Sequence, residues 1–327
     1  MDLDITNAAE NQSFILWLAP LHGLSGKVFR KAWLDHFSGI DIVLAPFILT
    51  INVDAYKETH FKDLRRESAI KVPLVPQILG NNAEGFIQTA RVLSDMGYDE
   101  VNWNLGCPYP MVTKKKRGSG LLPYPDMVRT ILDSVCPGVS MPVSVKLRLG
   151  LDDKREILDI IPVLNEYPLK RIIVHPRIGT QMYSGSVDLE AFTSVVGLSR
   201  QPLVYNGDIR DVDTFKMLRD RFPSVHEWMI GRWAVINPFL PAIIKSLPLP
   251  VNPAASIEAF HKDLYLGYRE VLQGSRHVLD KMKEVWSYLG LSYPGCKACL
   301  KAIHSAKTLE TYEHAVQILI STAYHNN

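Results

Sequence analysis

Short apolar runs alternate along the first 245 residues with segments whose apolar positions recur every three or four residues. Most of the runs are rich in Val, Ile and Leu and do not alternate with polar residues, which is typical of strands buried on both faces. They cover residues 14–19, 41–48, 73–79, 101–105, 143–149, 171–175, 202–206 and 228–231. The helical segments between them include 82–96, 125–135, 153–166 and 212–222. Eight such units predict an α/β fold of the (β/α)8 TIM-barrel class, and they share no side-chain consensus that would indicate a solenoid.

A proline-rich segment, 247–253, follows the predicted barrel. Repeated prolines end a helix and stiffen a linker. Beyond them, apolar residues at helical spacing predict helices over residues 256–272, 276–289, 294–306 and 308–323. We therefore expect a barrel domain over residues 1–245 and a small C-terminal all-helical bundle, packed on the barrel, over residues 246–327.

Composition narrows the class of protein. The chain has 327 residues, 47% of them hydrophobic, which is enough for one large core and a smaller one. The formal net charge is +2, so any basic surface must be local. Four cysteines in a chain of this length favour a reducing compartment over a disulfide framework. The sequence shows no signal-peptide pattern and no apolar run near the ~20 residues that span a bilayer. We expect a cytoplasmic protein that does not enter membranes.

Polar side chains follow the predicted strands at the ends where a barrel of this class forms its active site. They are His22, Gln77, Asn104, Lys146, Arg148, His175, Arg177, Asn206, Asp208 and Arg232. Taken singly, Lys146 fits a surface lysine and His175 fits a hydrogen-bonded core histidine. Cations inside apolar runs are costly without an anionic partner, so their convergence indicates a bound anion. Gly207 and Gly231 follow the seventh and eighth runs, where backbone N–H groups could hold a phosphate.

Cys107 lies between Gly106 and Pro108, directly after the fourth run. A thiol at the mouth of a strand can be a nucleophile or a proton donor, depending on its surroundings, or it can be structural. Four consecutive cations follow it and form what we call the basic segment: Lys114, Lys115, Lys116 and Arg117. The basic segment is either a solvated loop or a contact surface for a polyanion. Its position after Cys107 favours contact with a polyanion.

A set of motifs carries a resemblance to a known family. They are Ala19-Pro20 with Gly23; Gln77 with Gly80; Asn104-Leu105-Gly106-Cys107-Pro108; Gly118 to Leu122; Val145 to Gly150; His175-Pro176-Arg177 with Gln181, Tyr183 and Gly185; Asn206 to Ile209; and Gly231-Arg232 with Asn237-Pro238. In order and spacing this set resembles the tRNA-dihydrouridine synthases, flavin enzymes that reduce uridine in tRNA. The resemblance spans about residues 14–240, and the helical tail matches the family's architecture.

The resemblance implies a role for each matching residue. FMN contacts would come from Pro20, Leu21, His22, Gln77, Lys146, His175, Asn206, Gly207, Asp208, Gly231 and Arg232. Lys146 would lie beside the pyrimidine edge of the flavin, and Cys107 would be the proton donor to uracil. Asn104, Arg148 and Arg177 would contact the uridine or its neighbours, and the basic segment would bind tRNA. NADPH, or NADH, would be the transient reductant, and neither a metal nor a stable protein partner is implied.

Two positions depart from the family pattern. His22 follows Leu21 where relatives often have a small or acidic residue after Met, and Trp233 is bulky where a small residue is common. Two other functions compete with the resemblance. The basic segment and the tail argue against a flavin oxidoreductase for a free pyrimidine or enone. The complete set of polar strand ends argues against an RNA-binding module with a vestigial flavin site.

Two familiar motifs receive structural interpretations. No Gly-x-Gly-x-x-Gly follows a strand, so we expect no resident dinucleotide site and a nicotinamide donor that visits and leaves. Cys296-x-x-Cys299 has the spacing of half a metal site, but no second pair completes it. Helix packing is therefore the interpretation for these two cysteines.

Overall fold

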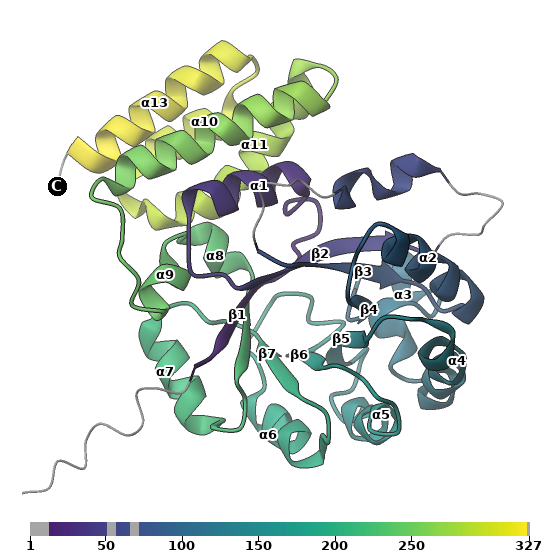
Figure 1. The fold of residues 1–327 in the computed structure, drawn as a ribbon. Coiled ribbons are helices and arrows are strands. Elements are labelled where there is room, and N and C mark those ends of the chain that lie inside the picture. The colour runs from purple at the N-terminus through teal and green to yellow at the C-terminus, as the bar shows by residue number, and fades with distance from the viewer. Residues whose placement is uncertain (1–12, 51–56, 66–71, 326–327) are drawn as a thin grey trace, which may run out of the picture.

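The computed structural model describes residues 13–50, 57–65 and 72–325. Within them, parallel strands close into a barrel in which each strand pairs with the next and β8 pairs with β1. The strands are β1 (Ile15–Leu18), β2 (Ile42–Leu49), β3 (Leu74–Leu79), β4 (Val101–Leu105), β5 (Val143–Gly150), β6 (Ile172–Ile178), β7 (Leu203–Asn206) and β8 (Glu227–Ile230). Figure 1 shows this barrel beneath the C-terminal helices. The predicted (β/α)8 barrel is confirmed.

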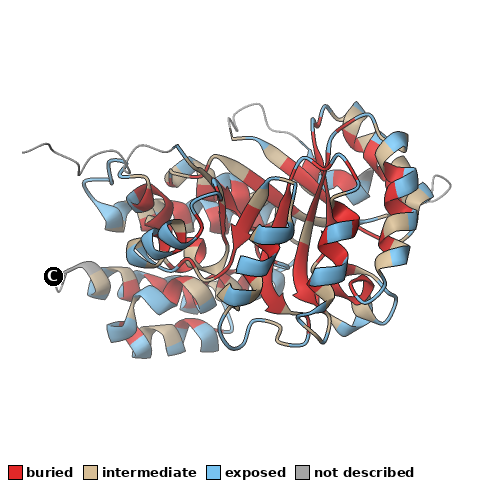
Figure 2. Cartoon of the chain, turned by 90° about the horizontal axis from the view of Figure 1, so that it is seen from below, coloured by how far each residue is buried: buried red, intermediate tan, exposed pale blue. Residues whose placement is uncertain are grey.

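Helices cover the outer faces of the strands, so that the strands are buried (Figure 2). They are α1 (Lys27–His36), α2 (Ala83–Asp95), α3 (Pro110–Thr113), α4 (Pro125–Gly138), α5 (Glu156–Leu164), α6 (Leu189–Leu198), α7 (Val212–Arg221), α8 (Arg232–Ile236) and α9 (Leu240–Ile244). Asn82, Asp188 and Asp211 cap α2, α6 and α7 by accepting a hydrogen bond from a backbone N–H three residues on. These caps fix the start of each helix after the loop that leaves the barrel mouth.

Side chains along each strand alternate between the helix layer and the barrel interior. The interior holds an apolar cluster of Trp17, Ala19, Leu44, Val75, Ile173, Val204 and Met229. A polar row lies above it, in which Gln77 Nε2 donates to Asn102 Oδ1 (2.7 Å) and Asn102 Nδ2 donates to Ser144 Oγ (2.9 Å). Because each of these buried amides has a partner, a polar layer beneath the mouth carries little cost.

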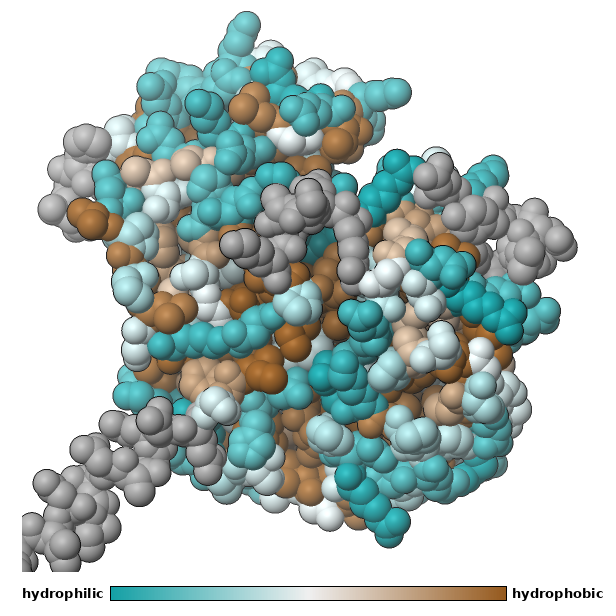
Figure 3. All heavy atoms as spheres, viewed as in Figure 1, coloured by the Kyte–Doolittle hydropathy of each residue, from teal (hydrophilic) through white to brown (hydrophobic). Residues whose placement is uncertain are grey.

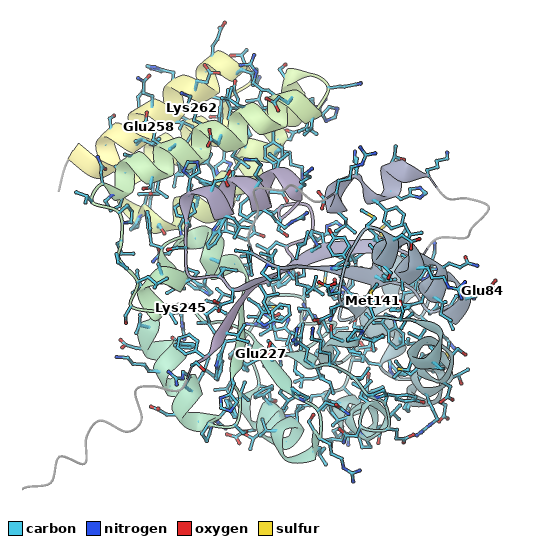
Figure 4. All side chains as sticks on the ribbon, viewed as in Figure 1. Glu84, Met141, Glu227, Lys245, Glu258 and Lys262 are labelled. Atoms are coloured by element: carbon cyan, nitrogen blue, oxygen red, sulfur yellow. The ribbon has the colours of Figure 1, made fainter. Side chains whose placement is uncertain are left out.

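An ion-pair network lies at the amino ends of the strands. Arg171 Nη1 donates to both carboxylate oxygens of Glu100 (3.1 and 2.9 Å), and its Nε lies 3.4 Å from Glu227 Oε2. The guanidinium also lies 4.7 Å from the centre of the Trp17 ring, whose Nε1 donates to Glu227 (2.8 Å). Glu227 and Lys245, which pairs with Asp41, are labelled in Figure 4. This network ties β1, β4, β6 and β8 together at the end opposite the mouth.

The C-terminal helices form a bundle beside α1 (Figure 1). They are α10 (Pro253–Val271), α11 (Ser275–Leu289), α12 (Lys297–Ser305) and α13 (Leu309–His325). The Phe260 ring of α10 makes edge contacts with Phe29 of α1 and with Phe37, the residue after α1, at centroid separations of 6.0 and 5.1 Å. Lys281 of α11 donates to the carbonyl of Gly23, in the loop after β1. The tail is therefore bound to the barrel by an apolar contact and, near the mouth, by a polar one.

The predicted helical tail is confirmed, and the predicted division at 245/246 falls between α9 and α10. Whether the two parts are separate domains stays a prediction. The outer face of the tail is largely hydrophilic in the view of Figure 3, and Glu258 and Lys262 are exposed on α10 (Figure 4).

Strand bounds differ from the sequence prediction by at most one residue, except at the end of β6, which differs by three. β6 continues through Pro176 and Arg177 to Ile178, because these residues still follow the barrel wall after the apolar run ends. β8 ends at Ile230, and Gly231 is instead the N-cap of α8. None of the described helices is both long and apolar enough to cross a membrane.

Candidate active site

A cavity of about 300 Å³ opens at the carboxyl ends of the strands. This volume is at the lower end of the range for small-molecule sites. The lining includes every predicted cofactor residue: Pro20, Leu21, His22, Gln77, Lys146, His175, Asn206, Gly207, Asp208, Gly231 and Arg232. Asn104, Cys107, Arg148 and Trp233 line it too. Residues far apart in the sequence thus meet in one place, because the strand ends of a closed barrel share one mouth.

Lys146, in β5, lies in this cavity with no hydrogen-bond or ion-pair partner among the described residues. Burial, with a smaller contribution from Arg148, lowers the pKa of Lys146 to about 7. Asp208 is the one carboxylate in the described lining, and it is already paired with arginines. An anionic ligand would therefore supply the counter-charge that the protein does not give Lys146.

His175 and Asp208 are held together by Arg177. Arg177 Nη1 lies 3.0 Å from His175 Nε2, and Arg177 Nη2 donates to Asp208 Oδ2 (2.5 Å) and to the carbonyl of Gly185 (2.6 Å). Arg232 adds a second ion pair to Asp208 at 3.1 Å. Asp208 has a φ of 39°, in the left-handed region that most side chains avoid. The two arginines stabilise this backbone conformation at the end of β7.

The imidazole of His175 is neutral. Burial, reinforced by neighbouring cations with Arg148 first among them, lowers its pKa well below the usual value. An arginine can only donate, so Nε2 of His175 accepts from Arg177 and the ring proton resides on Nδ1. His175 can therefore donate one hydrogen bond to a ligand in the cavity.

Asn104 positions Cys107. Its Oδ1 accepts hydrogen bonds from the backbone N–H groups of Gly106 (3.0 Å) and Cys107 (2.8 Å), and its Nδ2 donates to Gln77 Oε1 (2.7 Å). A Cβ on Gly118 would lie 2.5 Å from the carbonyl oxygen of Cys107, so glycine is required for this close approach. These contacts fix the thiol at the mouth of β4.

The thiol of Cys107 is buried, with 6% of the residue exposed. Burial raises its pKa, while a hydrogen bond from the backbone N–H of Tyr109 and the charge of Arg148 lower it by less. The basic segment is not among the groups that shift this pKa. Cys107 is therefore a protonated thiol at neutral pH, which suits an acid better than a nucleophile.

The basic segment lies outside the cavity, at the rim after α3. Lys114, Lys115 and Lys116 are exposed, and the Lys116 ammonium lies 4.0 Å from the centre of the Tyr124 ring. Arg117 Nε donates to Asn81 Oδ1 (3.2 Å). The segment thus holds a defined position, with its three lysines exposed to solvent.

Among the predicted contact residues, Arg177 is buried and also lies outside the cavity lining. It is 2% exposed. Its donors are used by His175, Asp208 and loop carbonyls. This arrangement favours a positioning role over direct contact with uridine or RNA.

Some residues of the lining escaped the sequence reasoning. Phe47 lies in β2, and its position near a strand end could have revealed it. Tyr109 lies two residues after Cys107. Tyr183 appeared in the motif set without a role, and its ring lies near the guanidinium groups of Arg148 (5.4 Å) and Arg232 (5.3 Å).

The described residues contain no group of three or more side chains suited to a metal ion. Cys296 and Cys299 are free thiols near the start of α12, and both pack against the apolar core of the tail.

A closed (β/α)8 barrel whose mouth gathers a protonated thiol, a lysine without a protein counter-charge and a neutral histidine defines an enzyme of the TIM-barrel class. The family described as Dihydrouridine synthase (Dus) matches residues 17–311, so the chain belongs to the dihydrouridine synthase family and is an oxidoreductase. The tRNA-dihydrouridine synthase B of Pasteurella multocida is 28% identical over 293 residues, covering 88% of this chain and 82% of that protein. Its namesake from Vibrio cholerae is 26% identical over 262 residues, covering 77% and 78%.

Solved structures agree on the fold. Morphinone reductase superposes with a TM-score of 0.51 at 12% identity, covering 76% of this chain and 88% of that one. A variant of NCR from Zymomonas mobilis gives a TM-score of 0.51 at 13% identity, covering 75% and 90%. At these identities the similarity shows the barrel alone. The family resemblance drawn from the motifs is confirmed by the family match.

Proposed function

We propose that this protein reduces one or more uridines of tRNA to 5,6-dihydrouridine, using FMN that NADPH re-reduces. The observation that carries the proposal is the meeting of Cys107, Lys146 and Arg148 in one cavity of a chain that belongs to the dihydrouridine synthase family. Reduction of the uracil double bond needs a hydride at one carbon and a proton at the other. Cys107 is the candidate proton donor, and the hydride would come from the flavin that the cavity would hold.

The residues present fit FMN. Lys146 without a protein counter-charge suits the electron-rich pyrimidine edge of a flavin, and neutral His175 offers one donor. Arg232, Gly231 and Gly207 lie together at the ends of β7 and β8, where a single phosphate would be neutralised. When bound there, FMN supplies hydride chemistry. Pro20, Leu21, His22, Gln77 and Asn206 complete the proposed contacts.

Cys107 donates the proton in this proposal. Its thiol is protonated at neutral pH because burial raises its pKa, and Asn104 fixes the backbone that carries it. A positioned acid typically contributes about 10²–10⁴-fold to a rate. Asn104 and Arg148 line the cavity beside the thiol and would contact the uracil edges.

The basic segment binds the tRNA backbone in this proposal. Lys114 and Lys115 are exposed at the rim next to the cavity, where phosphates of the strand entering the site would pass. A uridine stacked in folded RNA must leave its stack to reach the cavity. The helical tail extends the surface available to the same RNA on the side of α1.

The direct test is made on purified protein. FMN, and not FAD, should appear in the supernatant after denaturation, and addition of NADPH and unmodified tRNA should produce dihydrouridine. Reduction of free uracil at a comparable rate would instead favour a small-molecule reductase. A protein that takes up no flavin on reconstitution would exclude the proposed chemistry.

A further inference from the structure

Three aromatic rings form one side of the cavity mouth. His22 comes from the loop after β1, Phe47 from β2 and Tyr109 from the loop after β4. The His22 ring lies 5.9 Å from that of Phe47 at an interplanar angle of 28°, and 5.2 Å from that of Tyr109 at 49°. We call these three residues the aromatic wall. Three segments that are distant in the sequence thus form one continuous aromatic surface.

The aromatic wall is not part of the hydrophobic core. None of its members belongs to either apolar cluster or packs against one as a partly buried residue. His22 is exposed, and Phe47 and Tyr109 are half-buried. Their side chains make no hydrogen bond or ion pair among the described residues. Ring faces left open inside a cavity are suited to stacking with another flat ring.

The opposite side of the cavity is chemically different. Lys146, Arg148, His175 and Arg232 gather from β5, β6 and α8, and the Tyr183 ring lies near both arginines. That side suits a phosphate and the polar edges of a pyrimidine. The aromatic wall offers mainly ring faces, and its polar groups are the Tyr109 hydroxyl and the ring nitrogens of His22. It therefore suits a ring face and contributes little to reading base edges.

The chain order places the wall along the path of an RNA strand. Tyr109 stands between Cys107, the proposed proton donor, and the exposed cations Lys114 and Lys115. The backbone N–H of Tyr109 also donates to the Cys107 thiol, so the ring starts from a residue fixed beside the reacting base. A nucleotide whose neighbour is inserted at Cys107, and whose phosphate reaches the basic segment, passes this ring.

We propose that the aromatic wall stacks against the nucleobase adjacent to the target uridine and thereby contributes to the choice of uridine. The inference rests on the proposed function. Stacking of one base on aromatic side chains is worth about 1–3 kcal/mol, which is about 5- to 150-fold in affinity. Because every base has a ring face, the wall would favour larger rings, so a purine next to the target should bind better than a pyrimidine.

The test pairs a change in the protein with a change in the RNA. Tyr109→Ala and Phe47→Ala are each measured for binding to a tRNA carrying its natural neighbours, and to tRNAs made abasic at the 5′ or the 3′ neighbour of the target. Each variant should weaken binding of the natural tRNA by about 5- to 150-fold. One of the two abasic tRNAs lacks the base that stacks on the wall. The variant and the wild-type protein should bind that tRNA with equal affinity, because neither complex contains the stacked base.

Two control variants test whether a loss of tRNA binding is caused by loss of the aromatic ring. Tyr109→Phe keeps the ring and should restore binding to near the wild-type value. Leu49 lies two residues beyond Phe47, is 54% exposed and does not line the cavity. Leu49→Ala should therefore leave tRNA binding unchanged. If the loss of affinity from the protein substitution and the loss from the missing base added up for both abasic tRNAs, the proposal would be overturned.

Two further outcomes would show that the aromatic wall contacts a ring other than the neighbouring nucleobase. A weakened interaction with NADPH, at unchanged tRNA binding, would assign the wall to the adenine of the reductant. Loss of flavin from the variants, with tRNA binding retained, would assign it to the cofactor ring. Each result overturns the proposal, and neither resembles failure of the proposed function, in which the wild-type protein itself would make no dihydrouridine.

Discussion

Arg177 Nη1 lies 3.0 Å from His175 Nε2, two residues earlier on the same strand. The arginine is 2% exposed, and its other nitrogens bind Asp208 and loop carbonyls. One buried side chain therefore sets the tautomer of a cavity histidine and the position of a cavity carboxylate.

Arg177→Met should destabilise the protein by about 3 kcal/mol, at the lower end of the cost of breaking a buried ion pair. The lower end is expected because Arg232 still pairs with Asp208 at 3.1 Å. Urea unfolding measures the change. As a control, Arg155→Met breaks an exposed pair with Asp153, which solvent screens, and should change the stability far less. Equal effects from the two variants would contradict the role given to Arg177.

Lys146 should make the stability of flavin-free protein depend on pH. Its pKa is about 7 in the folded state against 10.5 ordinarily. Between these values the unfolded chain binds one proton more than the folded chain, so stability rises with pH across this window. The slope is about 1.4 kcal/mol per pH unit. Below about pH 7 both states are protonated, and the penalty for burying the charge is constant.

The measurement compares wild type with Lys146→Met, which keeps most of the length of the side chain and removes the charge. The wild-type stability minus that of the variant should increase from pH 7 toward pH 10. Other groups that titrate in this range cancel in the difference. A pH-independent difference would show that Lys146 titrates near its ordinary value.

Cys107→Ala should separate the two half-reactions. Flavin binding and its reduction by NADPH do not require the thiol, whereas oxidation of the reduced flavin by tRNA should slow by about 10²–10⁴-fold. Stopped-flow absorbance of the flavin resolves both steps. Cys107→Ser should recover little, because a hydroxyl is a far weaker acid. Wild-type rates of dihydrouridine formation in the alanine variant would make Cys107 structural.

Replacing Lys114 and Lys115 with alanine should weaken tRNA binding and reduce its salt dependence. Two fewer phosphate contacts should lower the slope of log K against log salt by about 1.4–1.8. Titrations at several salt concentrations measure it. The matched control is Lys216→Ala on α7, an exposed lysine outside the cavity lining. An unaltered slope would leave the basic segment as a solvated surface.

The barrel could be predicted from sequence because strands buried on both faces leave uninterrupted apolar runs, as in β1 and β2. The strand ends then indicated Lys146, His175 and Asn206, since a closed barrel brings such positions to one mouth. The extension of β6 past Pro176 was not predictable from apolar runs, because it includes Arg177, a charged residue that makes polar contacts.

The partners of each side chain could not be predicted. Arg148 and Arg177 occupy equivalent-looking positions in the sequence, yet the first lines the cavity and the second is enclosed by Ser184, Gly185 and Asp208. Phe47 was missed for a related reason. An apolar residue at a strand end is indistinguishable from core until the structure shows which face it presents.

The pairing of Arg171 with Glu100 and Glu227 lies at the amino ends of the strands, opposite Cys107. Interactions that hold the barrel shut and residues that select a ligand are thus spatially separate. Substitutions at the mouth, such as histidine at position 22, leave this network intact. The scaffold can therefore accept new rim residues at little cost to folding, which is how one architecture can diversify its choice of substrate by point changes.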